Sequence, residues 1–232
     1  MNLLLHRHFA RREVGHVAAA FGAMLPDLVR MVDRGWRPRP DRPYEAGDPE
    51  VLAVLEGIAH HVAIDVWFHR REELHHGERR TAEAFRGAGA TARRMPLLAH
   101  ATWEMLLDGA LARRLGPERV EEELRAECTA FARASRLAME HHGAGTWAVS
   151  EADLERLWRA VPTLASGYAS AEGLARRLDG LRASFGLGRA DPAELGRWIE
   201  ALDALAAHAD ATLVALETAR AEALRSAPDP SR

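Results

Sequence analysis

The stretch over residues 57–69 carries the residues whose types and spacing are best suited to chemistry. His61, Asp65 and His69 follow one another at intervals of four, inside a run whose apolar residues have a helical period. Residues four apart lie one above another on an α-helix, so these side chains share one face. Imidazole nitrogens and a carboxylate oxygen arranged in this way are typical ligands of first-row metals.

A second stretch repeats the arrangement. His100, Glu104 and Asp108 are again spaced four and four, within a helix predicted over residues 93–114. Each four-residue step turns the helix about 40° beyond a full turn, so three such residues spread over a face about 80° wide. A single triplet is weak evidence for metal binding, and the second triplet strengthens it.

Three residues nearer the start of the chain leave two readings open. His6 and His8 could lie on one side of an extended segment and bind a metal, or they could be a polar start to a helix. Asp27 follows Pro26, where a carboxylate is favoured in the first turn of a short helix. Asp27 could equally point at the metal of His61 and Asp65.

Two His pairs that precede a glycine are interpreted as helix ends instead of ligands. His75 and His76 precede Gly77, and a second pair precedes Gly143. Gly at the stop and cationic residues in the last turn are typical of a helix C-terminus. The central helix is therefore predicted to run from about Pro49 to His76, followed by a short helix at 78–85.

The remaining pattern predicts only helices. Apolar residues recur with helical spacing over 118–142, after Ser150, over 170–185 and from Pro192 to about Leu224, and no segment alternates like a strand. We expect an all-α fold with one domain of about eight helices over residues 1–225, similar to an HD domain. Residues 226–232 are expected to be a disordered tail. Nine of the 12 His lie at or before His100, so the metal site is expected mainly within residues 1–115.

Composition narrows the class of protein. The chain of 232 residues is 47% hydrophobic and 28% charged, with a net charge of −3, which does not suggest a nucleic-acid partner. Its one cysteine, Cys128, excludes an internal disulfide framework and favours a reducing cytoplasm. Met1–Phe9 is too short and too rich in His and Arg for a signal peptide. No apolar run is expected to span a membrane.

With these residues placed, the chain resembles the acyl carrier protein phosphodiesterase family, an all-helical group similar to HD domains. The likeness is best over residues 1–115. It is carried by an opening like Met-Asn-x-Leu-x-His-x-His-x-Ala, by a short acidic turn, and by a central helix like Gly-Ile-x-x-His-x-x-Ile-Asp. These motifs correspond here to Met1–Ala10, Pro26–Met31 and Gly57–Asp65.

The resemblance implies metal-dependent removal of 4′-phosphopantetheine from holo acyl carrier protein, which is a phosphodiester hydrolysis. It also implies that acyl carrier protein is the partner and that the motif residues form the site: His6, His8, Asp27, His61 and Asp65.

The chain also departs from the family pattern. Where the family has a carboxylate, Asp and His in a later helix, this chain has His100, Glu104 and Met105. The Thr-Asp that follows the central Asp in the family is replaced by Phe68 and His69. The chain is therefore interpreted as a divergent member with an altered ligand set.

These observations lead to a set of expected roles. The expected ligands of a divalent Mn, Fe or Zn ion are His6, His8, Asp27, His61, Asp65, His100 and Asp108. Glu104 or His69 is expected to act as general base or to support the ligands, because a base must reach the water without being bound to the metal. Arg side chains are expected to bind phosphate, with Arg30, Arg70, Arg71 and Arg94 as candidates.

Two alternatives remain open on sequence grounds. One is another phosphohydrolase of HD type, acting on a nucleotide or a lipid head group, although the chain lacks an adjacent His-Asp pair. The other is a non-catalytic helical protein in which buried His and carboxylate side chains bond to one another. Paired Arg residues, such as Arg79-Arg80 and Arg113-Arg114, form either a basic surface for an acidic carrier protein or solvated faces balanced by Glu.

Overall fold

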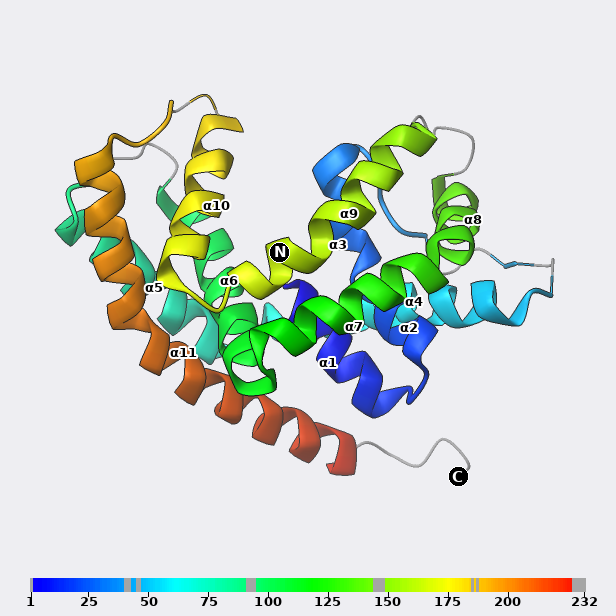
Figure 1. Cartoon of the computed structure of the whole chain (residues 1–232). Helices are drawn as coiled ribbons and strands as arrows, with labels where there is room; N and C mark the ends of the chain where they lie inside the picture. Colours follow the sequence, from blue (N-terminus) through cyan, green and yellow to red (C-terminus); the bar gives the residue numbers. More distant parts are fainter. Residues whose placement is uncertain are drawn as a thin grey trace.

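The fold is entirely helical in the part of the chain that the structure describes. The computed structural model describes residues 2–39, 43–44, 47–90, 95–143, 149–184, 186 and 188–226. In these residues there are eleven helices and no strand (Figure 1). The helices are α1 (Leu3–Glu13), α2 (Val17–Gly22), α3 (Leu25–Val32), α4 (Pro49–Phe68), α5 (Glu72–Gly87), α6 (Met95–Leu115), α7 (Pro117–Ala130), α8 (Ala132–Gly143), α9 (Glu151–Gly167), α10 (Ala171–Ser184) and α11 (Pro192–Ser226).

The all-α prediction is confirmed, but the described residues form more helices than the expected eight, partly because Leu3–Glu13 is helical and partly because one long predicted helix is divided. The segment 118–142 is divided at Phe131, which leaves helical geometry and packs its ring against Phe21 at 5.7 Å. Residues 227–232, most of the expected disordered tail, lie outside the described residues, and Ser226 ends α11.

The predicted end of the central helix is wrong. Helix α4 ends at Phe68, and α5 begins at Glu72 with Glu72 and Glu73 in its first turn, where acidic residues are favoured. Gly77 lies inside α5 and is no helix stop. A Cβ atom at Gly77 would overlap the ring of buried Trp103, so this glycine makes room for a side chain of α6.

Other predicted helix ends are confirmed. Ser150 forms a capping box with Asp153 at the start of α9. Asp191 accepts the Glu194 N–H at 2.7 Å at the start of α11. Gly143 is the last residue of α8.

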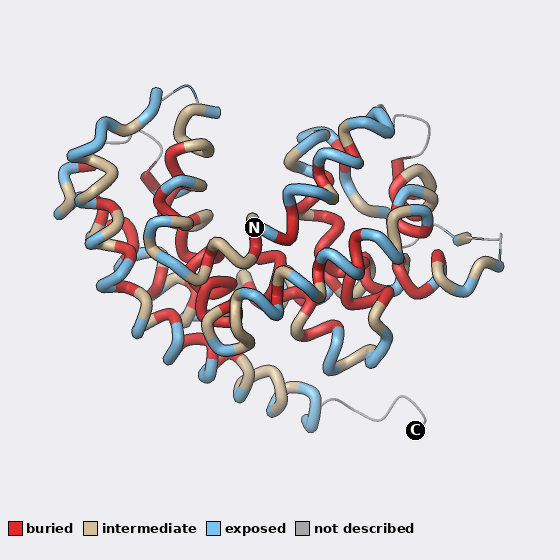
Figure 2. The backbone as a smooth tube through the Cα atoms, viewed as in Figure 1, coloured by how far each residue is buried: buried red, intermediate tan, exposed pale blue. Residues whose placement is uncertain are grey.

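Helix α6 lies at the centre of the molecule and contacts α1, α5, α7, α9, α10 and α11. Its buried residues point in all directions, as expected for a helix that is surrounded by others. Figure 1 shows α5, α10 and α11 on one side of it and α2, α3, α4, α8 and α9 on the other. Figure 2 shows buried residues concentrated along the middle of the molecule, and most residues of α1, α2 and α6 are buried.

Helix α1 begins in the interior, where two carboxylates hold its first turn. Asn2, which is 1% exposed, donates its N–H to Asp27 Oδ2 at 3.0 Å. Leu5 donates its N–H to Asp108 Oδ1 at 2.9 Å. The first amides of a helix have no partner inside the helix, so these carboxylates replace a local cap. They thereby fix the direction in which the next residue, His6, points.

Helices α2 and α4 approach so closely that their backbones touch. A Cβ at Gly57 would overlap the carbonyl oxygen of Ala19, and a Cβ at Gly22 would overlap that of Val54. Only glycine permits this distance between the two helix axes. The contact places His61 of α4 within hydrogen-bond distance of Ala23, next to the end of α2.

Within the described residues, α4 is the one helix long and apolar enough to cross a membrane by length and composition. This finding corrects the expectation that no apolar run reaches that length. A core helix of a folded domain passes the same test, and 44% of the apolar stretch of α4 is buried inside the molecule. Its length and composition are therefore weak evidence for a membrane span.

The close contact between α2 and α4 predicts that Gly57→Ala destabilises the protein. The added methyl must displace backbone, which costs about 1–3 kcal/mol of unfolding free energy or more. The matched control is Gly180→Ala in α10, where an added Cβ meets nothing within 4 Å. That control should be stabilised by about 0.5–1 kcal/mol, since alanine is the better helix former. Urea unfolding measures both, and equal stability of the two variants would contradict the close approach.

Candidate metal site

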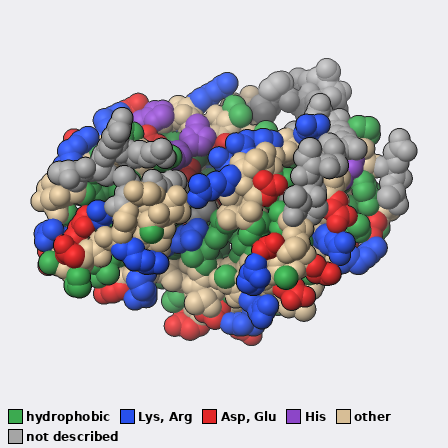
Figure 3. All heavy atoms as spheres, turned by 90° about the horizontal axis from the view of Figure 1, so that it is seen from above, with side chains coloured by type: hydrophobic (Ala, Val, Ile, Leu, Met, Phe, Trp, Pro, Cys, Tyr) green, Lys and Arg blue, Asp and Glu red, His purple; other side chains and the backbone are tan. Residues whose placement is uncertain are grey.

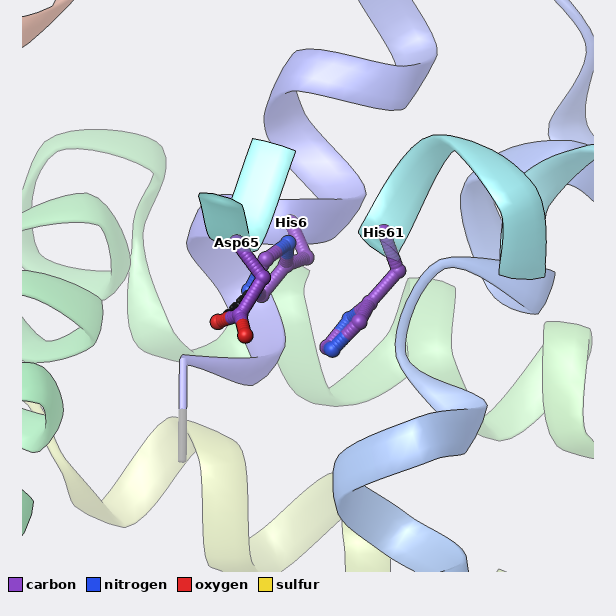
Figure 4. Close-up of side chains that lie close together, drawn as sticks. All are labelled: His6, His61 and Asp65. Carbon is purple, nitrogen blue, oxygen red and sulfur yellow. Dashed lines mark ion pairs between the residues drawn. The ribbon is translucent and has the colours of Figure 1, made fainter. Parts of the chain in front are cut away.

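Three of the expected ligands lie together in the structure. His6 of α1 and His61 and Asp65 of α4 each offer one ligand atom, and these atoms lie within 4.8 Å of one another. We call these residues the first group. Figure 4 shows their side chains side by side, with His6 Nε2 3.9 Å from Asp65 Oδ1. The rings of His6 and His61 are stacked, with centroids 3.8 Å apart.

The hydrogen bond of His61 and the lowered pKa of His6 both suit metal binding. His61 Nδ1 lies 2.8 Å from the Ala23 carbonyl oxygen. Because a carbonyl can only accept, Nδ1 carries a hydrogen, and Nε2 is the ring nitrogen that remains to face a ligand. Burial, together with the neighbouring His61, holds the pKa of His6 well below its usual range, so His6 is neutral near pH 7.

A second group of possible ligands lies beside the first. It consists of His69, which caps the C-terminus of α4, and His100 and Glu104 of α6. His100 Nε2 lies 3.3 Å from Glu104 Oε1, and His69 Nε2 lies 4.0 Å from the same oxygen. The rings of His69 and His100 are stacked at 5.2 Å. We call these residues the second group.

Asp65 connects the two groups. Its Oδ1 lies 3.1 Å from His69 Nε2, and the same oxygen faces His6. Burial alone would raise the pKa of Asp65, but the hydrogen bond from His69 and the nearby His6 lower it below its ordinary value. The same hydrogen bond raises the pKa of His69. Asp65 is therefore ionised at neutral pH and can serve either group.

Asp27 lies next to the first group but is not one of its three members. Its Oδ2 accepts the Asn2 N–H. Burial alone would raise the pKa of Asp27, but His61, His6 and the Asn2 N–H are among the influences that hold it well below its usual range. Asp27 is thus a half-buried negative charge beside two imidazoles, and it favours a cation there.

His8 lies outside both groups. The segment is helical and not extended, so a residue two positions from His6 points to a different side of α1. His8 Nε2 lies 2.6 Å from Glu217 Oε1 of α11. Its imidazole is therefore used in a hydrogen bond between α1 and α11.

Asp108 also lies outside both groups, although it is one turn beyond Glu104. It is fully buried, and one of its oxygens accepts the Leu5 N–H. Burial raises the pKa of Asp108 to about 8, against the opposing effect of the Leu5 and Leu4 N–H groups. The second triplet is therefore divided, since His100 and Glu104 face His69 whereas Asp108 caps α1.

The Arg residues expected to bind phosphate lie in different places. Arg30 is exposed in the last turn of α3, and Arg94 lies outside the described residues. Arg70, exposed and directly after His69, lines an open cavity of about 690 Å³ together with residues of α5 and α11. Arg71 lines the same cavity but is held by Glu73 and by the ring of Trp67. Figure 3 shows His and Arg side chains close together on one face of the molecule.

The sequence pattern does not indicate Glu78, a residue that contacts the second group. Glu78 of α5 places Oε1 2.6 Å from His100 Nδ1. The two residues are 22 positions apart on different helices, so no helical spacing relates them.

No family model, curated protein or solved structure matches the chain. The function must therefore be inferred from the geometry of the two groups and from the resemblance of the sequence motifs.

The position of Asp108 predicts an unusual pH dependence of stability. Its pKa of about 8 in the folded protein exceeds the ordinary value of 3.8, so unfolding releases a proton between these pH values. The free energy of unfolding then falls as pH rises, by at most about 1.4 kcal/mol per pH unit. Asp108→Asn keeps an oxygen for the Leu5 N–H but has no ionisable group. The decrease in unfolding free energy that Asp108 causes should therefore be absent from the variant.

Urea unfolding at about pH 5 and about pH 7 measures this effect as the difference between variant and wild type. The stability of Asp108→Asn relative to wild type should rise between the two values. Its metal content should equal that of wild type, because Asp108 belongs to neither group. Parallel pH profiles of the two proteins would show that Asp108 is ionised in the folded state.

Proposed function

We propose that this protein is a metal-dependent phosphodiester hydrolase that resembles acyl carrier protein phosphodiesterase. The observation that carries the proposal is the first group, in which two imidazoles and a carboxylate from two helices converge within 4.8 Å. Convergence alone is common among polar side chains. The tautomer of His61 and the neutral state of His6 make this group a suitable ligand set.

The donor atoms fit a divalent transition metal. Two nitrogens and one carboxylate oxygen suit Mn, Fe or Zn, and three protein ligands leave positions open for water and substrate. A metal held here would supply Lewis-acid chemistry by activating water and by neutralising charge on phosphate oxygens. His61 is oriented for this role by the Ala23 carbonyl, and His6 by the capped start of α1.

The cavity that Arg70 helps to line could hold an anionic substrate. Arg70 follows His69 directly in the chain, and its guanidinium can bind a phosphate oxygen through two N–H groups. A cavity of about 690 Å³ has the size of a typical small-molecule site. The proposal therefore assigns phosphate binding to Arg70 and metal binding to the first group.

The identity of the substrate rests on the sequence motifs. The surface of an enzyme for acidic carrier proteins should be basic, yet several of the paired Arg residues are neutralised. Arg79 lies 2.6 Å from Glu72, Arg113 lies 2.8 Å from Asp210, and Arg114 lies 2.7 Å from Glu217. Holo acyl carrier protein is therefore the first substrate to test, and nucleotide and lipid phosphodiesters follow it.

Metal content and hydrolysis of a chromogenic phosphodiester, bis(p-nitrophenyl) phosphate, test the proposal. Wild-type protein should contain Mn, Fe or Zn and hydrolyse the probe. Asp65→Ala and His61→Ala should lose both the metal and at least about 100-fold of the rate, because each removes a ligand. The matched control is Asp203→Ala, an exposed carboxylate of α11, which should resemble wild type in both properties.

Circular dichroism separates loss of the site from loss of the fold, since the helical signal should stay the same in all variants. Absence of metal after reconstitution, with unchanged helicity, would assign the polar side chains a structural role and refute the proposal. Hydrolysis of the probe without release of 4′-phosphopantetheine would support the hydrolase activity. It would exclude holo acyl carrier protein as the substrate.

A further inference from the structure

The second group has the separations of a ligand set. Ligands bound at about 2.0–2.2 Å around a tetrahedral ion lie roughly 3.3–3.6 Å from one another. His100 Nε2 lies 3.3 Å from Glu104 Oε1, and His69 Nε2 lies 4.0 Å from that oxygen. Small side-chain movements bring all three to one ion, which would take the place of the hydrogen that His69 Nε2 donates to Asp65.

The orientation of His100 is fixed from outside the group. Its Nδ1 lies 2.6 Å from Glu78 Oε1, and a carboxylate oxygen accepts a hydrogen there. Nδ1 therefore carries the hydrogen, and Nε2 faces Glu104. A carboxylate behind an imidazole is the usual arrangement at metal-binding histidines, because it sets the tautomer and makes the ring a better donor.

The second group is open on one side and closed on the other. The side chain of Glu104 is 6% exposed, whereas those of His69 and His100 are 38% and 31% exposed. A buried carboxylate is stabilised by a cation, and the exposed imidazoles leave room for water and substrate. Both features are expected of a site that binds an ion and a ligand together.

Asp65 relates this group to the first. The same oxygen, Oδ1, lies 3.1 Å from His69 Nε2 and 3.9 Å from His6 Nε2. A carboxylate oxygen in this position can contact ions on both sides. The two groups are therefore neighbours that share one ligand.

We propose that His69, His100 and Glu104 bind a second divalent transition-metal ion, and that Asp65 lies between this ion and the one bound by the first group. The inference rests on the proposed function for the first ion. It replaces the general-base role expected for Glu104 and His69 by direct metal binding. Two neighbouring ions suit a phosphodiester, because they bind the attacking and the leaving oxygen of one phosphate.

Counting bound ions tests this assignment without reference to activity. The protein is stripped with a chelator, reloaded with Mn²⁺, desalted and analysed for metal per chain. Wild type should retain about two ions, as in two-metal sites. The variants His100→Ala and Glu104→Gln should retain about one, and so should His6→Ala, because each group loses its ion separately. The matched control His141→Ala, a histidine of α8 outside both groups, should retain both ions.

Two further measurements sharpen the test. Glu78→Gln should weaken binding of one ion by about 10–100-fold while the other stays, since Glu78 orients His100 and is not itself one of the three ligands. Electron paramagnetic resonance of the Mn²⁺-loaded protein should show magnetic coupling in wild type that is lost in His100→Ala.

The outcomes separate this inference from the proposed function. One ion in wild type, retained in His100→Ala and lost in His6→Ala, would overturn the second site and leave the hydrolase proposal in place. No ion in any sample would overturn both. Two ions without magnetic coupling would remove Asp65 as the shared ligand and so contradict the inference as stated.

Discussion

The burial of the first turn of α1 is the constraint on which the first group depends. A helix N-terminus in the interior carries amides that need acceptors, and this chain supplies carboxylates from two other helices. Asp27 comes from α3 and Asp108 from α6, so α1, α3 and α6 are tied together at one point. His6 follows directly after these amides, and its position is therefore determined by them.

The contact of α2 with α4 determines the other half of the site. Gly22 and Gly57 allow the two backbones to touch, which leaves the end of α2 close enough to accept a hydrogen from His61. One turn later on α4, Asp65 places its Oδ1 between the two groups. The site thus depends on two backbone features: the buried start of α1 and the close contact between α2 and α4.

Carboxylates are gathered around the imidazoles of the site. The carboxylates beside the imidazoles are Asp27, Asp65, Glu78 and Glu104, and each lies near at least one His ring. This concentration of acidic oxygen atoms around the rings favours cations. Away from the site, Arg and Glu side chains pair across neighbouring helices, for example Arg220 with Glu13, and Arg7 with Glu127.

The sequence by itself determined the helical class, several helix ends and the pairs that depend only on helical spacing. Asp65 with His69 and His100 with Glu104 lie four residues apart, and both pairs form as expected because spacing along one helix is a local property. The contact of His6 with the central helix was indicated by the family motifs, not by spacing.

The tertiary structure alone decided how the triplets are used. Their members were expected to act together, yet Asp65 faces two groups and Asp108 caps α1. Glu78 reaches His100 only because α5 packs against α6. Contacts between helices depend on which faces pack and at what distance. Small features such as Gly57 and Gly77 control that packing, and their role is not visible in the periodicity of the chain.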